Sequence, residues 1–423
     1  MLKRIYIDNY KSLVNAELKV NTINLFLGAN GSGKSAVFEV LRAIQDFVCV
    51  GSKATDVLDA KSLTRWQNSP LQTFELDIKG PEGLYKYELV IEHLEGEQRA
   101  RVQREHLFFD DKPLLRLEKG EVHLHRDDHS AGPTFPIERT LSAVGAIPLR
   151  HDNTRLTWFR ERLARFIVVQ IIPPMMFEES PQGDSQLSLY MENFTSWYRH
   201  VSQDQGMTFQ LMNELKEVIP GFDSFKFQQV GEKHRLLNVF FSNEGTRAPT
   251  GYHFGELADG QRMLIALYTL LYAARVDQDH EYTLCLDEPE NFVALSEIQP
   301  WLTALYDSCT DGQVQALLIS HHPELMDYLL ASPVGYWFER QSNRPTRIKP
   351  VSAAGKGGLP ISEIVARGWL NEPVNEKDTY RKLENEGACK PVVAELAKRR
   401  REPLPEGAPS SLEAACGELP RIL

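Results

Sequence analysis

Hydrophobic and polar residues alternate near the start of the chain, which is the pattern of half-buried strands. Residues 4–8 and 16–20 show this period of two, with a polar bend at residues 9–12 between them. Residues 23–27 form a short apolar run that stops at a glycine-rich loop, and residues 36–48 then place apolar side chains at helical spacing. The opening is therefore predicted to contain a strand, a glycine loop and a helix in succession.

The period returns to two between residue 73 and about residue 126, which indicates an antiparallel meander rather than a parallel α/β continuation. Turns containing glycine or aspartate separate the segments. The predicted strands are residues 74–78, 85–92, 101–108 and 121–125. Residues 129–136 are rich in turn-forming residues and are predicted to be a loop.

The remaining chain alternates helical and strand patterns and then loses its periodicity. Helices are predicted at residues 154–165, 187–218, 259–274 and 296–308 and from residue 323, and strands at residues 166–172, 225–230, 235–241, 282–286 and 315–319. Residues 371–423 are rich in Pro, Glu, Lys and Arg, and we expect a helix followed by a mobile tail there.

Composition narrows the class of protein. The chain has 423 residues, of which 42% are hydrophobic and 25% charged, as in soluble globular proteins. It contains no apolar run long enough for a membrane helix and no apolar signal core after Met1, so we expect a cytoplasmic protein without a membrane partner. The net charge of −11 argues against general nucleic-acid coating but leaves a local basic groove open. Five scattered cysteines without a CxxC pair favour reduced thiols.

Residues 28–35 fit the phosphate-loop pattern G-x-x-x-x-G-K-[ST] without a mismatch. The glycines let backbone N–H groups point at phosphate oxygens, and the helix that follows adds its positive dipole end. Lys34 is expected to reach the β- and γ-phosphates of ATP, and the Ser35 hydroxyl to bind Mg²⁺. The predicted ATP-binding residues of the loop are Asn30, Gly31, Ser32, Gly33, Lys34 and Ser35.

Two carboxylates end the apolar strand predicted at residues 282–286. Asp287 is placed to hold Mg²⁺, and Glu288 to accept a proton from an attacking water molecule. Many strands end in acidic residues, so the pair is informative mainly because the chain also contains a complete phosphate loop.

Four segments resemble the ABC-type ATPases, and in particular their SMC, RecF and OLD branch. Residues 256–262 resemble the signature loop, residues 286–291 the Walker B segment, and residues 318–324 the switch-histidine segment. The bend Asn-Tyr-Lys-Ser at residues 9–12 is similar to the Asn-Phe-Arg-Ser element of that branch. Together with the phosphate loop, these segments stand in the family order over about residues 1–350. The chain therefore resembles a RecF/OLD-like ATPase without a long coiled coil.

The resemblance implies an α/β fold, an ABC-type P-loop ATPase head with an accessory antiparallel β lobe and a helical insertion. Its expected parts are residues 1–186 (phosphate loop and β lobe), 187–230 (helical insertion), 231–370 (signature, Walker B and switch His) and 371–423 (helix and tail). We expect the helical insertion, residues 187–230, to contact the partner protein.

The resemblance also implies a homodimer in which two heads enclose two ATP molecules. Gly260 and Arg262 would act on the nucleotide of the neighbouring subunit, and His321 would contact the γ-phosphate. Lys11 and Ser12 would line the adenine side. Gln170 is a candidate for the family's lid glutamine, although a strand residue pointing to solvent explains it equally well.

The chain departs from the family at two places. Ala258 replaces the signature serine, and the loss of one hydrogen bond to phosphate would weaken dimer closure by roughly 1.5–3 kcal/mol. We therefore expect slow hydrolysis and a long-lived ATP state. Residues 292–296 differ from the family's Leu-His-Pro segment, so the dimer-contacting loop is expected to be altered.

Three biological roles stay open at this point. The first is an ATPase that controls a separate effector such as a nuclease in bacterial anti-phage defence, because residues after 340 lack the Glu and Asp-x-Asp pattern of a TOPRIM nuclease. The second is a RecF-like DNA-repair ATPase that clamps duplex DNA. The third, suggested by Ala258, is a non-hydrolysing scaffold gated by nucleotide. A basic run at residues 398–401 could touch nucleic acid, but a charged helix end is the commoner outcome.

Overall fold

The computed structural model of the chain describes residues 1–94, 100–242, 248–275, 281–322, 325, 334–351 and 362–363. The chain divides into two units, Met1–Glu363 and Ile364–Leu423. The second unit lies outside the described residues, as do the predicted terminal helix, the tail and the basic run at 398–401. Only Leu325 of the helix predicted from residue 323 is described. The elements below belong to the first unit.

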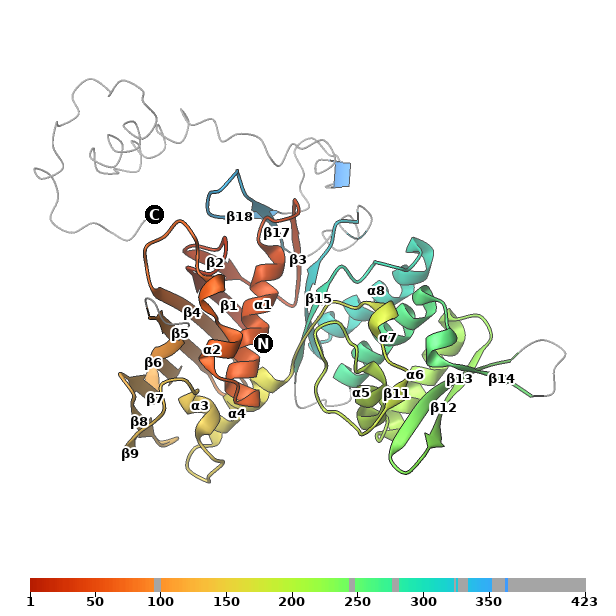
Figure 1. The fold of residues 1–423 in the computed structure, drawn as a ribbon, viewed down its shortest axis with the longest axis horizontal. Helices are drawn as coiled ribbons and strands as arrows, with labels where there is room; N and C mark the ends of the chain where they lie inside the picture. Colours follow the sequence, from red (N-terminus) through yellow and green to blue (C-terminus); the bar gives the residue numbers. More distant parts are fainter. Residues whose placement is uncertain are drawn as a thin grey trace, which may run out of the picture. The chain divides into compact units, whose positions relative to one another are not determined.

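An eight-stranded antiparallel sheet forms one side of the first unit, with the strand order β2-β1-β4-β5-β6-β7-β8-β9 (Figure 1). Its strands are β1 Leu2–Asp8, β2 Ala16–Lys19, β4 Leu71–Lys79, β5 Leu84–His93, β6 Ala100–Phe109, β7 Lys112–Glu118, β8 Glu121–His125 and β9 Ala131–Pro136. The alternation seen in the sequence has a structural cause in β4, where Phe74, Leu76 and Ile78 are buried and the residues between them are not.

Two strands of this sheet correct the sequence prediction. Residues 131–136 were predicted to be a loop but form β9, whose Phe135 pairs with Val122 of β8. No residue of β9 is fully buried, so no apolar alternation marks it, and its prolines are tolerated because it is an edge strand. Strand β7 was not predicted at all. A register shift opposite Leu107 and Phe108 buries Leu114 and Leu115 together, which breaks the period of two.

A six-stranded sheet with the order β10-β15-β16-β3-β17-β18 carries the glycine loop. All of its pairings are parallel except that of β18. The strands are β3 Ile23–Gly28, β10 Phe166–Val169, β15 Tyr282–Asp287, β16 Val314–Ile319, β17 Val334–Glu339 and β18 Arg347–Val351. Every residue of β3 and β16 is buried, as expected where both faces of a parallel sheet are covered. The carboxyl ends of the parallel strands meet at one edge, where ligands of open α/β sheets bind.

Helix α1, Lys34–Gln45, follows the glycine loop directly and continues into a π-helical turn, Asp46–Val50. Its apolar side chains, including Val37, Leu41 and Ile44, share one core with residues of both sheets. The predicted helix at 154–165 forms α4, Thr154–Ala164. The strand predicted at 166–172 ends early, at Val169, and a 3₁₀ turn at Pro173–Met175 follows.

A second group of elements surrounds a small sheet, in which β13 pairs with β11, β12 and β14. The elements are α5 Phe194–Val201, α6 Gln205–Val218, β11 Glu179–Ser180, β12 Phe222–Val230, β13 His234–Phe241, β14 Thr250–His253, α7 Asp259–Arg275 and α8 Leu295–Thr310. Residues 187–193 are not helical, and β12 pairs with β13 through Phe225 and Val239. The segment 187–230 is therefore partly helical and partly strand, and its predicted end falls inside a hairpin.

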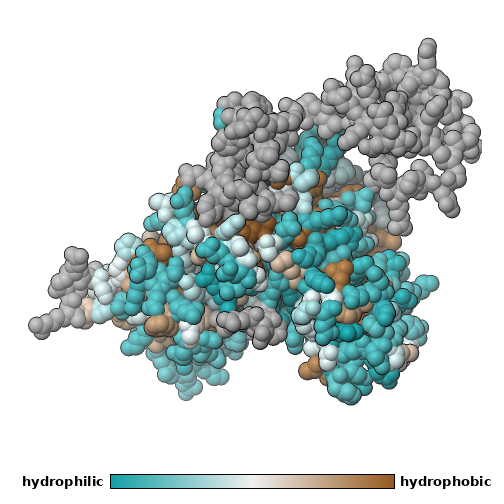
Figure 2. Space-filling model, turned by 180° about the vertical axis from the view of Figure 1, so that it is seen from behind, coloured by the Kyte–Doolittle hydropathy of each residue, from teal (hydrophilic) through white to brown (hydrophobic). Residues whose placement is uncertain are grey.

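The face drawn in Figure 2 is mostly hydrophilic, with apolar residues scattered over it. Large exposed apolar side chains include Phe177, Phe209 and Phe292. Within the described part of the chain, no helix combines the length and the apolar character that a membrane crossing requires.

Candidate functional site

The glycine loop joins the carboxyl end of β3 to the first turn of α1. Gly33 has φ +100°, a left-handed conformation that suits glycine. A Cβ atom there would lie 2.8 Å from Ser12 Oγ and 2.9 Å from Thr346 Oγ1, so the position has no room for a side chain. Thr346 Oγ1 also donates to the carbonyl oxygen of Ser32 at 2.8 Å. The glycine loop is thus packed between Ser12, near the start of the chain, and Thr346, more than 300 residues later.

Lys34 lies inside the curl of this loop. Its Nζ donates to the carbonyl oxygens of Gly28 at 2.8 Å and Ala29 at 3.1 Å, and the residue is only 5% exposed. Burial lowers the pKa of Lys34, while Asp287 and Glu288 act in the opposite direction. The ammonium group is therefore held beside the loop and faces two carboxylates.

Ser35 and Asp287 are 252 positions apart in the sequence, yet the Ser35 hydroxyl donates to Asp287 Oδ2 at 2.7 Å. The parallel register brings them together, since β16 pairs with β15 on one side and with β3 on the other. Burial raises the pKa of Asp287, and the Ser35 hydrogen bond opposes that rise. A hydroxyl and a carboxylate oxygen are hard ligands of the kind that Mg²⁺ takes together with phosphate and water. No group of three or more His, Cys, Asp or Glu side chains in the described ranges could hold a metal alone.

Glu288 and His321 face each other across the ends of β15 and β16, with Glu288 Oε1 3.5 Å from His321 Nε2. Glu288 has φ +51°, an uncommon conformation for a residue with a side chain, and its N–H donates to the Ile319 carbonyl at 2.9 Å. Asn291 Nδ2 donates to Glu288 Oε2 at 2.8 Å. Burial lowers the pKa of His321, and the positive charge of Lys34 adds to this effect. The imidazole is therefore neutral at pH 7.

Glu290 stabilises the loop that carries His321. Its Oε1 atom accepts a hydrogen bond from Ser320 Oγ at 2.6 Å and another from the His321 N–H at 3.1 Å. The Ser320 side chain and the His321 backbone are thereby hydrogen-bonded to the segment that follows β15. These contacts fix the backbone at His321, and the imidazole itself faces Glu288.

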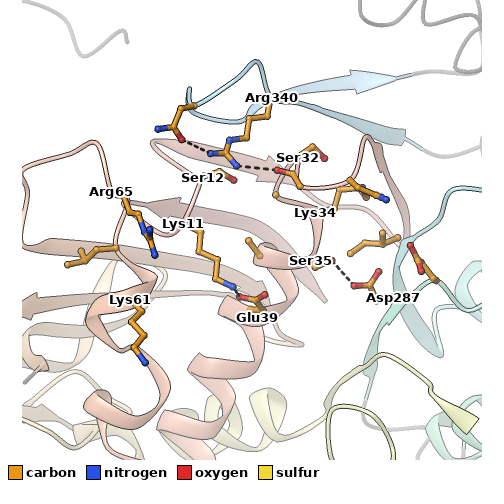
Figure 3. Close-up of a pocket in the computed structure, with 18 of the residues that line it drawn as sticks. Lys11, Ser12, Ser32, Lys34, Ser35, Glu39, Lys61, Arg65, Asp287 and Arg340 are labelled. Carbon is orange, nitrogen blue, oxygen red and sulfur yellow. Dashed lines mark hydrogen bonds and ion pairs between the residues drawn. The ribbon is translucent and has the colours of Figure 1, made fainter. Parts of the chain in front are cut away.

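Lys34, Ser35, Asp287, Glu288 and His321 all line one cavity of about 490 Å³, which is in the size range of small-molecule sites (Figure 3). We call its first side the phosphate wall; it consists of the lining residues of the glycine loop with Asp287, Glu288 and His321. We call a second part of the lining the far wall; it consists of Lys61, Leu63, Arg65, Trp66, Arg340 and Asn343. Lys11, Ser12 and Glu39 lie between the two walls.

Asn9 holds the loop that forms most of the far wall. It is fully buried with φ +61°, and its Nδ2 donates to the carbonyl oxygens of Ser69 at 2.9 Å and Leu71 at 2.7 Å. Its Oδ1 accepts from the Thr64 N–H at 3.2 Å. Three hydrogen bonds from one side chain therefore fix residues 64–71 against the end of β1. The first residue of the Asn-Tyr-Lys-Ser bend acts here as a loop anchor.

The other members of that bend line the cavity. Lys11 forms an ion pair with Glu39 of α1, and Glu39 also accepts a hydrogen bond from the Tyr10 hydroxyl at 3.0 Å. Ser12 is buried and lies 2.9 Å from Thr346 Oγ1. Lys11 and Ser12 both line the cavity, and their placement on the adenine side stays a prediction.

None of the six far-wall residues was predicted from the sequence: Lys61, Leu63, Arg65, Trp66, Arg340 and Asn343. They come from two loops that the sequence pattern does not associate. The one usable signal was the cluster of Lys61, Arg65 and Trp66 shortly after α1, in a stretch without periodicity.

Three predicted residues lie outside this cavity lining. Arg262, on α7, donates through Nη1 to the Pro173 carbonyl at 2.8 Å and pairs with Asp259. Gly260, at the start of the same helix, lies close to the Phe292 carbonyl, 3.0 Å from where its Cβ would be. Gln170 directly follows β10, whose Val169 pairs with Leu286, so it reaches the strand edge beside Asp287. Its N–H donates to the Leu189 carbonyl at 2.8 Å.

Comparison with known proteins gives a distant structural likeness. No protein-family profile and no curated protein matches the chain. Among solved structures, the fold is similar to the SMC head domain from Thermotoga maritima, with 14% identity and a TM-score of 0.43 over 83% of this chain and 99% of that one. This likeness is too distant to assign a family.

Proposed function

We propose that the chain is an ABC-type ATPase that binds ATP with Mg²⁺ and hydrolyses it slowly within a homodimer. The observation that carries the proposal is the 2.7 Å contact of Ser35 with Asp287 in a cavity that also contains Lys34, Glu288 and His321. These are the residue types that phosphoryl transfer to water requires, and distant parts of the chain supply them.

Each residue of the phosphate wall has a role in this proposal. Backbone N–H groups of the glycine loop and the Lys34 ammonium bind the β- and γ-phosphates. Ser35 and Asp287 hold Mg²⁺, which would neutralise charge on the phosphate oxygens. Glu288 takes a proton from the attacking water molecule. The oxygen of that water bonds to the γ-phosphorus, and the bond from the γ-phosphorus to the ADP oxygen breaks. His321 donates a hydrogen bond to the γ-phosphate.

The signature segment has its role in the partner copy. Gly260 and Arg262 lie outside the lining of this chain's own cavity, which fits a contact with the nucleotide of a second subunit. Ala258 has no hydroxyl to offer there. We therefore expect Ala258→Ser to tighten the ATP-dependent dimer by about 10- to 150-fold, as one added hydrogen bond of 1.5–3 kcal/mol to a charged group would. Sedimentation of both proteins with ATP measures this; equal dimer affinities would contradict it.

The finer part of the proposal is that the ATP-bound dimer controls a separate effector, such as a nuclease, in bacterial anti-phage defence. The resemblance of the sequence to RecF- and OLD-like ATPases supports it. Two alternatives to this role are a RecF-like clamp on duplex DNA and a nucleotide-gated scaffold that does not hydrolyse ATP.

One set of measurements separates these functions. The wild-type protein should bind ATP and release phosphate, and Lys34→Ala should do neither. Glu288→Gln, tagged and held in ATP, is then recovered from its native host. A stoichiometric second protein that is absent with Lys34→Ala supports the effector role. Bound DNA without a protein partner supports the clamp, and ATP binding without any phosphate release supports the scaffold.

A further inference from the structure

An aromatic ring and a guanidinium group face each other in the far wall of the cavity. The Arg340 Cζ atom lies 5.4 Å from the centroid of the Trp66 ring, and both residues are partly exposed. Trp66 comes from the segment between the 3₁₀ turn Ala60–Ser62 and β4, and Arg340 from the turn between β17 and β18. Two flat groups with access to the same cavity offer stacking surfaces for a flat ligand.

The Trp66 indole has a second feature that points to a ligand. Its Nε1 atom is buried and makes no hydrogen bond in the part of the chain that the structure describes. A buried indole N–H normally has an acceptor. The far wall therefore holds a donor without an acceptor beside the ring face that Arg340 covers.

The two groups are held with very different firmness. Arg340 makes three hydrogen bonds, to Arg344 O at 3.2 Å, Asn343 Oδ1 at 3.3 Å and Gly31 O at 3.4 Å. All three lie at or beyond the long end of the usual N–H···O range. The Trp66 loop, in contrast, is fixed by Asn9 and by the Lys11 N–H, which donates to Ser62 O at 2.6 Å. Arg340 is therefore held by hydrogen bonds that are longer on average than those of the loop under Trp66.

We infer that Trp66 and Arg340 clamp the nucleobase of the nucleotide whose phosphates the glycine loop binds; this inference rests on the proposed function. A base between two flat groups needs about 7 Å, or two contacts of about 3.5 Å, so the guanidinium must move outward by about 1.5 Å from its 5.4 Å position. The loose hydrogen bonds of Arg340 allow that movement. Its contact with Gly31 places the clamp next to the phosphate loop.

The chemistry favours a base over a further phosphate group at this place. Three further cations line the cavity: Lys11, which is paired with Glu39, and Lys61 and Arg65, so the preference for a base depends on the Trp66 ring rather than on charge. A ring face gives a phosphate nothing to bind, whereas stacking of a base on an aromatic ring is favourable for every base. The clamp should therefore distinguish a nucleotide from a bare polyphosphate, and it should discriminate weakly among bases.

The test compares ATP with inorganic tripolyphosphate, each with Mg²⁺, by titration calorimetry. Trp66→Ala is expected to weaken ATP binding roughly 10- to 100-fold, the range for losing one stacked base. Tripolyphosphate binding should stay within about twofold, because no phosphate-wall residue is altered. Trp66→Phe should recover most of the ATP affinity. Arg340→Lys, which keeps the charge but loses the flat plane, should weaken only ATP.

Each other outcome has a distinct meaning. Equal binding of ATP and tripolyphosphate by the wild-type protein overturns the clamp and leaves the proposed function standing. An equal loss of both ligands in Trp66→Ala, not recovered by Trp66→Phe, also overturns the clamp, because the residue would then only support the loop. If neither ligand binds the wild-type protein, the proposed function itself fails, and the clamp fails with it.

Discussion

The phosphate wall and the far wall of the cavity are built in opposite ways. The phosphate wall sits on the carboxyl ends of β3, β15 and β16, which are adjacent strands of one parallel sheet. The far wall consists of two loops, one anchored by Asn9 and the other carried by the β17–β18 turn. Groups that meet charge must be placed within tenths of an ångström, and regular strands achieve this placement. Groups that stack on a flat surface tolerate movement, so loops are sufficient.

The largest effect should come from the phosphate wall. Glu288→Gln keeps the size of the side chain but removes the proton acceptor, so phosphate release should fall about 10²- to 10⁴-fold. ATP affinity should change little. A steady-state phosphate assay and calorimetry measure both quantities. Glu121→Gln, an exposed change on the distant strand β8, is the matched control. Hydrolysis at the wild-type rate in Glu288→Gln would show that Glu288 is not the proton acceptor and that the phosphate wall does not carry the chemistry.

The junction of the walls at Gly33 gives the next largest effect, on stability. Gly33→Ala must adopt φ +100° and also push its Cβ against Ser12 and Thr346. Gly31→Ala, at φ +74° with nothing within 4 Å, carries only the backbone penalty of about 1–2 kcal/mol. We expect Gly33→Ala to lose a further 1–3 kcal/mol or so in urea unfolding without nucleotide. Equal losses of unfolding free energy in Gly33→Ala and Gly31→Ala would show that Ser12 and Thr346 move aside at no cost.

Asn9→Asp should loosen the far wall alone. The substitution keeps the side-chain shape and tolerates φ +61°, but it replaces a donor to two carbonyl oxygens by an acceptor. We expect a loss of about 3 kcal/mol in the free energy of unfolding, because buried acceptors lose their partners. Asn15→Asp is the matched control, with φ +49° and an exposed side chain. Tripolyphosphate affinity that falls as far as ATP affinity would contradict the independence of the walls.

The smallest effect concerns pH. The pKa of His321 is lowered by burial and by Lys34, so the free imidazole gains a proton only below pH 6.5. Bound triphosphate brings negative charge and raises this pKa, so binding takes up a proton. Affinity for ATP should therefore increase as pH falls below 6.5, by a few-fold more in the wild type than in His321→Asn. Calorimetry in two buffers measures the proton uptake. Identical pH dependences would exclude His321 from the phosphate contact.

The two walls also differ in how far the sequence predicts them. The strand, loop and helix around Lys34 follow from local pattern, and Asp287 follows an apolar run that can only be a buried strand. The contact of Ser35 with Asp287 was implied by the family resemblance rather than by local pattern. Trp66 and Arg340 could not be paired from the sequence, because their meeting depends on the hydrogen bonds of Asn9 and on the β17–β18 turn. Strand β9 escaped prediction for a related reason, since neighbouring backbone rather than its own side chains defines it.

The position of β3 has a consequence for the synthesis of the protein. Both of its neighbours in the sheet, β16 and β17, leave the ribosome far later than β3 itself, and Thr346 grips the glycine loop only after them. The nascent chain therefore carries the loop on a strand with two unpaired edges, a state that chaperones recognise. The complete set of contacts around the glycine loop is therefore a property of chains translated at least as far as β18. A product terminated earlier would lack the Thr346 contact with that loop.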